Sequence, residues 1–219
     1  MILAQAPGRA GIIGNPTDGY GGAMIACALP YYATTILEDN DELELVIEDK
    51  KTTIRWKSDL KLKNDSFDLA RSVLRYFFPL DLKARIKMDS CIPRQAGMAG
   101  STALLYSILG AILEKLEKDY SLYYFAELNR IIELRYMKTH CGYQDAYMTT
   151  FGGLNFLDFR GKEYYRELKN ELYAAVEPLA VPQLPFIVAH TGIKHHSGDY
   201  HKPIRERWLE GEKEVVKGY

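Results

Sequence analysis

A run of small residues in the middle of the chain constrains the fold most. In the stretch "IPRQAGMAGSTALLYSILGAI" (92–112), four small residues precede a long apolar run: Ala96, Gly97, Ala99 and Gly100. Glycine and alanine leave the backbone accessible, so the N–H groups of this loop can approach a ligand closely. The apolar residues that follow recur at helical spacing, which predicts a helix over 101–118. The sequence therefore predicts a bare loop that leads into a buried helix.

Phosphate is the ligand that suits such a loop. The first N–H groups of a helix are unpaired and lie at the positive end of the helix dipole. We expect Ser101 and Thr102 at the helix cap, where their hydroxyls can reach a phosphate oxygen or a magnesium ion. The alternative is a tight connection with an ordinary serine cap, which also needs glycine. The loop is neither a Walker A motif, whose lysine it lacks, nor a G-x-G-x-x-G fingerprint.

Composition and charge exclude several classes of protein. The chain is 47% hydrophobic and 26% charged, with a formal net charge of −1, which is typical of a globular protein and predicts no nucleic-acid partner. The opening residues lack the pattern of a secretory signal, and no apolar run reaches the roughly 20 residues that span a bilayer. Cys27, Cys91 and Cys141 fit neither a zinc site nor a disulfide framework. We expect a cytoplasmic protein whose thiols are buried or incidental.

The order of strands and helices predicts an α+β domain. Alternating apolar and polar residues favour strands over 42–49, 52–59 and 82–93, and 22–39 is typical of buried, partly β-structured chain. Apolar residues at helical spacing predict helices over 65–78 and 122–138, the first capped by Asn64 or Asp65. Residues 141–159 pass from a glycine turn through a short helix to a strand.

The last part of the chain differs from the rest. Residues 160–183 turn charged and then proline-bearing, which indicates a linker. A short strand is expected over 184–192 and a helix over 203–216, and no further element is visible before the last residue, Tyr219. We therefore expect a domain over 1–180 and the start of an incomplete second lobe over 181–219.

Three segments resemble the N-lobe signatures of one enzyme family, the GHMP small-molecule kinases. They are "PGRAGIIGNPTD" (7–18), "PRQAGMAGSTA" (93–103) and "GYQD" (142–145), in the family's order. Together with the late "RERWLEGE", they are most similar to glucuronokinases, and "QDAYMTTFGGLNFLDF" is also similar to heptose-phosphate kinases. The resemblance implies a two-lobed α+β fold and ATP-dependent phosphorylation of a hydroxyl on a sugar or sugar acid.

The resemblance assigns the chemistry to Asp145 and Arg9. A kinase that moves phosphate onto an alcohol needs a carboxylate that orients the hydroxyl and accepts its proton, and Asp145 matches it. Arg9 matches the basic residue that pairs with this carboxylate and faces the transferred phosphoryl group. Without the resemblance, Asp145 would cap the short helix after it and Arg9 would lie on a surface strand.

The nucleotide and its magnesium ion have their own expected residues. The loop that would hold the phosphates of ATP comprises Pro93, Gly97, Met98, Ala99, Gly100, Ser101 and Thr102. Ser101 and Glu133 are the expected Mg²⁺ ligands, because magnesium prefers hard oxygen atoms and keeps several waters. The alternative for Glu133 is an ion pair with a basic neighbour on its own helix.

The acceptor is expected to lie against Asn15, Asp18 and Tyr20, which fall where the family binds acceptor hydroxyls. Many galactokinases carry an acidic residue at the position of Asn15, so its neutral amide is compatible with an acidic acceptor such as a uronate. Turn formation around Pro16 is the alternative role for Asn15 and Asp18.

A sugar 1-kinase of the glucuronokinase type is the favoured interpretation. A mevalonate kinase, a heptose-phosphate kinase or a non-catalytic ligand sensor on the same fold are the alternatives. The family's C-lobe signature has no match here, so we expect a truncated chain, a separate C-lobe chain or a homo-oligomer. A histidine-rich stretch, with His190, His195, His196 and His201 near Asp199, fits no standard zinc spacing.

Overall fold

The computed structural model describes residues 1–219 except 79–80, 163–171, 182–183, 190–191, 193–196 and 219, and it leaves the side chains of 197–202 undescribed. Its strands are β1 (Ile2–Ile13), β2 (Ala23–Asp39), β3 (Leu43–Ile47), β4 (Lys50–Ile54), β5 (Ala84–Ser90), β6 (Leu154–Asp158) and β7 (Ala175–Pro178). Its α-helices are α1 (Asp68–Tyr76), α2 (Gly100–Lys115), α3 (Leu122–Ile131), α4 (Gln144–Phe151), α5 (Ser197–Leu209) and α6 (Lys213–Gly218). The predicted α+β class is confirmed.

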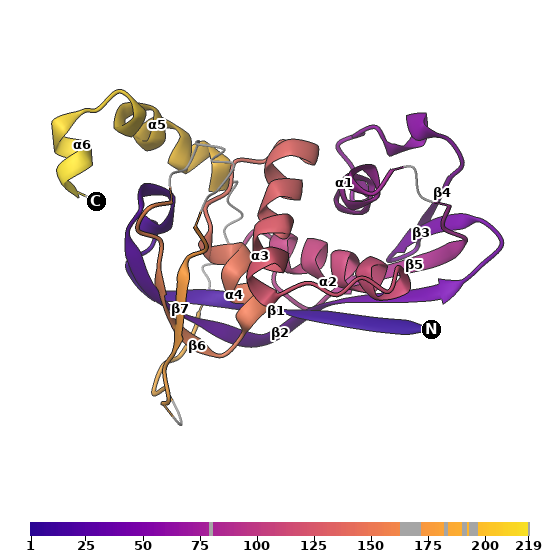
Figure 1. The fold of residues 1–219 in the computed structure, drawn as a ribbon, viewed down its shortest axis with the longest axis horizontal. Helices are drawn as coiled ribbons and strands as arrows, with labels where there is room; N and C mark the ends of the chain where they lie inside the picture. The colour runs from indigo at the N-terminus through magenta and orange to yellow at the C-terminus, as the bar shows by residue number, and fades with distance from the viewer. Residues whose placement is uncertain (79–80, 163–171, 182–183, 190–191, 193–196, 219) are drawn as a thin grey trace.

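One mixed sheet organises these elements (Figure 1). The strands are ordered β4-β3-β5-β2-β6-β7, and β1 pairs with β2 in antiparallel register, as Ala6 opposite Ala33 illustrates. The β3–β5 pair is parallel, and the other strand pairs are antiparallel. The long strand β2 pairs with β1, β5 and β6, so it joins the two halves of the sheet.

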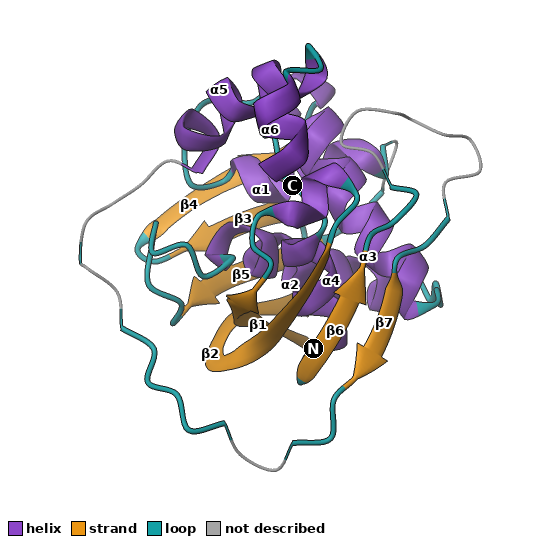
Figure 2. Ribbon diagram, turned by 90° about the vertical axis from the view of Figure 1, so that its left-hand side faces the viewer, coloured by secondary structure: helices purple, strands orange, loops and turns teal. Residues whose placement is uncertain are grey.

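The helices α1 to α4 lie on one face of this sheet, as Figure 2 shows with the strands in front and the helices behind. Helix α2 packs on β1, β2 and β5, and its apolar side chains, including Leu105, Ile108 and Ile112, are fully buried. Burying such a side chain contributes about 1.5–3 kcal/mol relative to leaving it exposed. A second apolar cluster lies between α4 and β6, where Tyr147 and Leu157 are buried. This second cluster anchors α4, which contributes Tyr147 and Met148 to it.

Several predicted boundaries are wrong. The strand expected over 52–59 is β4, which ends at Ile54 and is followed by a 3₁₀ turn, η2 (Lys57–Leu60). The helix expected over 122–138 ends as an α-helix at Ile131 and continues as one π-helical segment, η3 (Ile132–Tyr136). A cap by Asn64 or Asp65 is also wrong, because α1 begins after Phe67 without a side-chain cap.

The region beyond residue 160 departs further from expectation. Part of the expected linker is strand β7, which pairs with β6 at the edge of the sheet. The strand expected over 184–192 is absent from the described residues 184–189, where Ile187 is almost fully exposed. A strand needs a partner strand, and this segment has none among the described residues. The helix expected over 203–216 is two helices, because α5 ends at Leu209 and α6 begins at Lys213.

The structure also bears on membrane spans and on the cysteines. None of the described helices is long and apolar enough to cross a bilayer. The three cysteines are free thiols; Cys91 is exposed, and Cys27 and Cys141 are half-buried.

Candidate active site

The loop between β5 and α2 takes left-handed backbone conformations at three points. Gln95, Gly97 and Ala99 have φ angles of 57°, 70° and 58°. Ala99 is therefore the N-cap of α2, and the helix begins at Gly100. The expectation that Ser101 and Thr102 form the cap is wrong, because the left-handed Ala99 starts the helix before them.

The two sides of this loop have different surroundings. A Cβ atom at Gly97 would meet nothing within 4 Å, so this glycine faces open space. A Cβ atom at Gly8 of β1 would lie 2.9 Å from the carbonyl oxygen of Met98, so the strand and the loop are in close contact. The N–H of Arg9 donates to that same oxygen at 3.1 Å. One side of the loop is thus fastened to β1, and the other is open.

Around the opening, the residues of the predicted phosphate loop differ in accessibility. Gly97 and Ser101 are exposed, and Pro93 and Gly100 are half-buried. The side chains of Met98, Ala99 and Thr102 are buried. The groups that a ligand could reach are therefore the backbone at Gly97 and the first turn of α2.

Arg9 joins this loop to Asp145. The register of β1 against β2 shifts between Pro7 and Arg9, a bulge of the kind that re-aims a side chain. The Nε atom of Arg9 donates to Oδ1 of Asp145 at 2.7 Å, and its Nη1 donates to the carbonyl of Gly97 at 2.6 Å. The side chains of Arg9 and Asp145 are 10% and 29% exposed, so the pair remains accessible. The structure thus brings three of the predicted site residues together.

Asp18 holds the turn that carries Asp145. It lies in the short helix η1 (Thr17–Tyr20), and its Oδ2 atom accepts hydrogen bonds from the backbone N–H groups of Tyr143 and Gln144, at 2.7 and 2.9 Å. A Cβ atom at Gly142 would lie 2.1 Å from the same oxygen, so the turn needs glycine there. Burial raises the pKa of Asp18, while the two backbone N–H groups lower it. Asp18, predicted to bind acceptor, is 2% exposed and faces the turn.

Asn15 and Tyr20 flank Asp18. The Nε2 atom of Gln144 donates to Oδ1 of Asn15 at 2.5 Å, and Asn15 itself is exposed. The ring of Tyr20 packs edge-on against Trp208 of α5, with their centroids 5.2 Å apart. Helix α5 therefore lies against the segment that carries the predicted acceptor residues.

Glu133 lies behind the first turn of α2. It is 3% exposed, and its Oε1 atom accepts a hydrogen bond from the hydroxyl of Thr102 at 2.8 Å. Burial, together with the charge of Asp145, raises the pKa of Glu133 to about 7. Ser101, the other predicted metal ligand, is exposed and makes no hydrogen bond to Glu133 within the described part of the chain. Thr102 is the hydroxyl that contacts Glu133.

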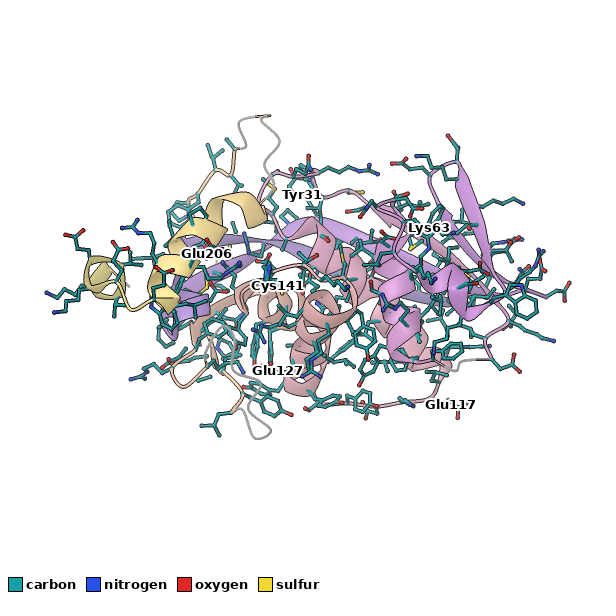
Figure 3. All side chains as sticks on the ribbon, turned by 90° about the horizontal axis from the view of Figure 1, so that it is seen from above. Tyr31, Lys63, Glu117, Glu127, Cys141 and Glu206 are labelled. Carbon is teal, nitrogen blue, oxygen red and sulfur yellow. The ribbon has the colours of Figure 1, made fainter. Side chains whose placement is uncertain are left out.

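A second charged cluster lies on the other side of the Asp145 turn. Two cations lie near the ring of Tyr143, with the guanidinium carbon of Arg130 3.7 Å and Nζ of Lys162 4.7 Å from its centroid. Lys162 also pairs with Glu127 at 2.7 Å, and Glu127 accepts the hydroxyl of Tyr147 at 2.5 Å. In Figure 3, Cys141 lies near the centre of the molecule and Glu127 lies below it. Apart from the half-buried Glu127, the residues of this cluster are buried, and they pack against Tyr143 of the turn.

Sequence reasoning missed several of these residues. Gln144 stands in the "GYQD" segment next to Asp145, so a polar side chain in a predicted catalytic turn was an available signal. Glu127, Arg130 and Lys162 carried no such signal, because charged residues on a helix or in a turn are usually solvated. His190, His195 and His196, and the side chains of Asp199 and His201, lie outside the described residues.

Comparisons with known proteins find one family model and several sugar kinases that are similar to this chain. Residues 67–153 match the family model described as GHMP kinases N terminal domain. The chain is 24% identical over 227 residues to Glucuronokinase 1 of Arabidopsis thaliana, covering 95% of this chain and 62% of that protein. It is 28% identical over 179 residues to a galactokinase of Thermotoga neapolitana, covering 78% of this chain and 51% of that protein.

A solved structure supports the same fold. A D-glycero-D-manno-heptose 1-phosphate kinase from Bacteriodes thetaiotaomicron superposes with a TM-score of 0.70 at 23% identity, over 82% of this chain and 60% of that one. At this identity the similarity shows the fold alone. The chain spans about 62% of the length of the glucuronokinase that it matches.

Proposed function

Because residues 67–153 match the model of the GHMP kinase N-terminal domain, we propose that the chain is the nucleotide-binding lobe of an ATP-dependent kinase. The acceptor is a hydroxyl of a sugar or sugar acid, and a glucuronokinase-like sugar 1-kinase is favoured. In this proposal, residues 1–180 form the ATP-binding lobe and 181–219 begin a C-terminal lobe. The proposed partner is a separate C-lobe chain or a second copy of this chain.

The contact between Arg9, Asp145 and Gly97 carries this proposal. One guanidinium donates both to the carboxylate of Asp145 and to the carbonyl of the open loop. A phosphoryl group held at the loop would therefore lie within reach of a cation and a carboxylate together. Phosphoryl transfer needs this combination, because catalysis rests on positioning and on stabilising charge.

Each residue has one task in the reaction. Asp145 orients the acceptor hydroxyl and accepts its proton as the hydroxyl oxygen bonds to the γ-phosphorus of ATP. Arg9 stabilises the negative charge on the moving phosphoryl oxygens, and ADP leaves with the electron pair of the broken P–O bond. Backbone N–H groups from Gly97 to Thr102 hold the phosphates at the start of α2.

The donor set fits a magnesium ion. Glu133 is buried, and the negative charge of Asp145 contributes to its raised pKa. A divalent cation would therefore offset the repulsion between these two carboxylates. Glu133 and the exposed hydroxyl of Ser101 would supply its protein oxygens, and the nucleotide phosphates and water the rest. The ion, when bound, neutralises charge on the phosphates.

Asn15 and Tyr20 are proposed to contact the acceptor. Asn15 is exposed and accepts a hydrogen bond from Gln144 of the Asp145 turn, and Tyr20 lies in the same short helix as Asp18. Asp18 contributes through the turn that it holds, since its Oδ2 atom accepts two backbone N–H groups. A cytoplasmic location remains part of the proposal.

Thermal unfolding with magnesium and a non-hydrolysable ATP analogue tests the nucleotide site. Ligand at a hundredfold excess over Kd should add about 2.7 kcal/mol to the free energy of unfolding. The variant Gly97→Ala should abolish this increment, because its methyl group projects into the open side of the loop. Gly211→Ala is the matched control: Gly211 has a φ of 73°, close to the 70° of Gly97, and also faces open space.

Release of ADP with D-glucuronate and with D-galactose tests the chemistry. Phosphorylation of either sugar supports the kinase, and the faster one identifies the acceptor class. Nucleotide binding without transfer to any acceptor, in a chain completed with its C-terminal lobe, would favour the ligand sensor. No nucleotide increment in the folded protein would contradict the proposal.

A further inference from the structure

Gln144 is held to Asp18 by two of its atoms. Its backbone N–H donates to Oδ2 of Asp18 at 2.9 Å, and its side-chain Nε2 lies 3.5 Å from Oδ1 of the same carboxylate. Both residues are buried, at 7% and 2% exposure. The Gln144 side chain is therefore fixed by a group that solvent does not reach.

This anchoring decides which way the amide of Gln144 points. A carboxylate oxygen accepts hydrogen bonds, so the amide turns its Nε2 donor toward Asp18 and toward Oδ1 of Asn15. The reverse orientation would face the Gln144 oxygen against the oxygen of Asp18. In the observed orientation of the amide, Oε1 of Gln144 is buried without a hydrogen-bond partner among the described residues.

The orientation of the Gln144 amide also fixes the orientation of the Asn15 amide. Since Oδ1 of Asn15 accepts from Gln144, its Nδ2 is the amide group left to face outward. That Nδ2 donates to no described residue, and Asn15 is exposed. We call this chain of contacts, Asp18 to Gln144 to Asn15, the amide relay.

We propose that Gln144 is a positioning residue for acceptor choice, which turns the Nδ2 donor of Asn15 outward so that the site selects an acceptor carboxylate. This inference rests on the proposed function and narrows its acceptor to the sugar acids. A hydroxyl both donates and accepts, so it pairs with either face of the Asn15 amide. A carboxylate only accepts, so it pairs only with the donor face, and its charge strengthens the bond.

Isothermal titration with D-glucuronate and D-glucose, in the presence of magnesium and the ATP analogue, tests the relay. The two sugars differ only at the carboxylate carbon. The wild type should bind D-glucuronate at least about tenfold more tightly, as one charge-assisted hydrogen bond implies. The variant Asn15→Asp keeps an oxygen for Gln144 and presents a second oxygen outward, so it should lose D-glucuronate and keep D-glucose.

The variant Gln144→Met tests the relay without changing Asn15. It keeps the length of the side chain and removes the donor, so Asn15 can turn and the preference for D-glucuronate should fall several-fold. A merely structural role would weaken both sugars equally. Gln5→Met is the matched control, because Gln5 is an exposed residue of β1 whose amide, among the described residues, donates to Thr34.

Three results would overturn the relay: equal binding of the two sugars by the wild type, equal weakening of both by Gln144→Met, or binding of neither. If magnesium and the ATP analogue still raise the free energy of unfolding in those cases, the kinase proposal is not contradicted. If the ATP analogue does not raise the free energy of unfolding of the wild type, the kinase proposal itself is contradicted.

Discussion

Two ion pairs lie on opposite sides of helix α4, and they differ in what they can do. Arg9 and Asp145 face the phosphate loop, and the Asp145 side chain is 29% exposed. Lys162 and Glu127 lie behind the turn, and the Lys162 side chain is 1% exposed. Both pairs join an amine or guanidinium to a carboxylate. Accessibility, and not charge, makes the first a candidate for chemistry and the second a support.

The neighbours of the two pairs explain this difference. Arg9 also donates to a loop carbonyl, next to a glycine that faces open space. Lys162 donates to the carbonyl of Leu172, and Glu127 accepts from Tyr147, so protein groups surround that pair. A buried pair is costly to break, because the remaining charge has no water to solvate it. We therefore expect opposite outcomes from equivalent substitutions on the two sides.

The largest effect is expected on turnover, at the accessible pair. Asp145→Asn removes the proton acceptor and should lower kcat by about 10²–10⁴-fold, the usual contribution of a general base. The free energy of unfolding should fall by less than at the buried pair, because Asp145 is 29% exposed and Arg9 keeps its hydrogen bond to the carbonyl of Gly97. Steady-state kinetics and urea denaturation measure the two quantities. Asp49→Asn, in an exposed turn, is the control, and undiminished kcat in Asp145→Asn would exclude Asp145 as the base.

At the buried pair, the largest effect should fall on stability. Lys162→Met leaves Glu127 without its cation and should lower the free energy of unfolding by about 3–5 kcal/mol. Replacing both residues, with Lys162→Met and Glu127→Gln, should recover part of that loss, because no unpaired charge remains. Urea denaturation measures both variants. A loss below about 1 kcal/mol in the single variant would mean that this pair is solvated like the other.

A smaller effect is expected at the turn between the two pairs. Gly142→Ala introduces a Cβ atom 2.1 Å from Oδ2 of Asp18, and it should cost about 1–3 kcal/mol, as overpacking does. Adding Asp18→Ala removes the clash, so the two changes should be non-additive in a double-mutant cycle. Additive losses would show that the turn moves away from Asp18 in the single variant.

The smallest effect is a pH dependence at Asp18. Burial raises its folded-state pKa above the ordinary 3.8, so ionising it costs stability. Relative to Asp18→Asn, the wild type should therefore keep its full stability below the unfolded-state pKa and lose stability as pH rises through the folded-state pKa. Each unit of pKa difference corresponds to about 1.4 kcal/mol. Urea denaturation from pH 4 to pH 8 measures the difference, and parallel curves would mean that the two backbone N–H groups fully offset burial.

Much of the fold and of the site followed from local pattern. The bare loop before α2, the strands β3 and β5 and the buried face of α2 were predictable, because glycine and periodic apolar residues act over a few positions. Arg9 and Asp145 stood out only through motifs, and their contact spans 136 residues. The cap at Ala99 and the edge strand β7 were missed, since a left-handed alanine and a four-residue strand leave little signal.

The sequence by itself determined that this chain has an α+β fold, a glycine-rich loop that opens a helix and an aspartate in a glycine turn. Only the tertiary structure decided that Asp18 holds that turn, that Gln144 orients Asn15 and that Lys162 is buried with Glu127. Each of those contacts joins residues more than 30 positions apart. The physical reason is that burial and partner choice depend on which segments the sheet brings together, and no local pattern encodes that.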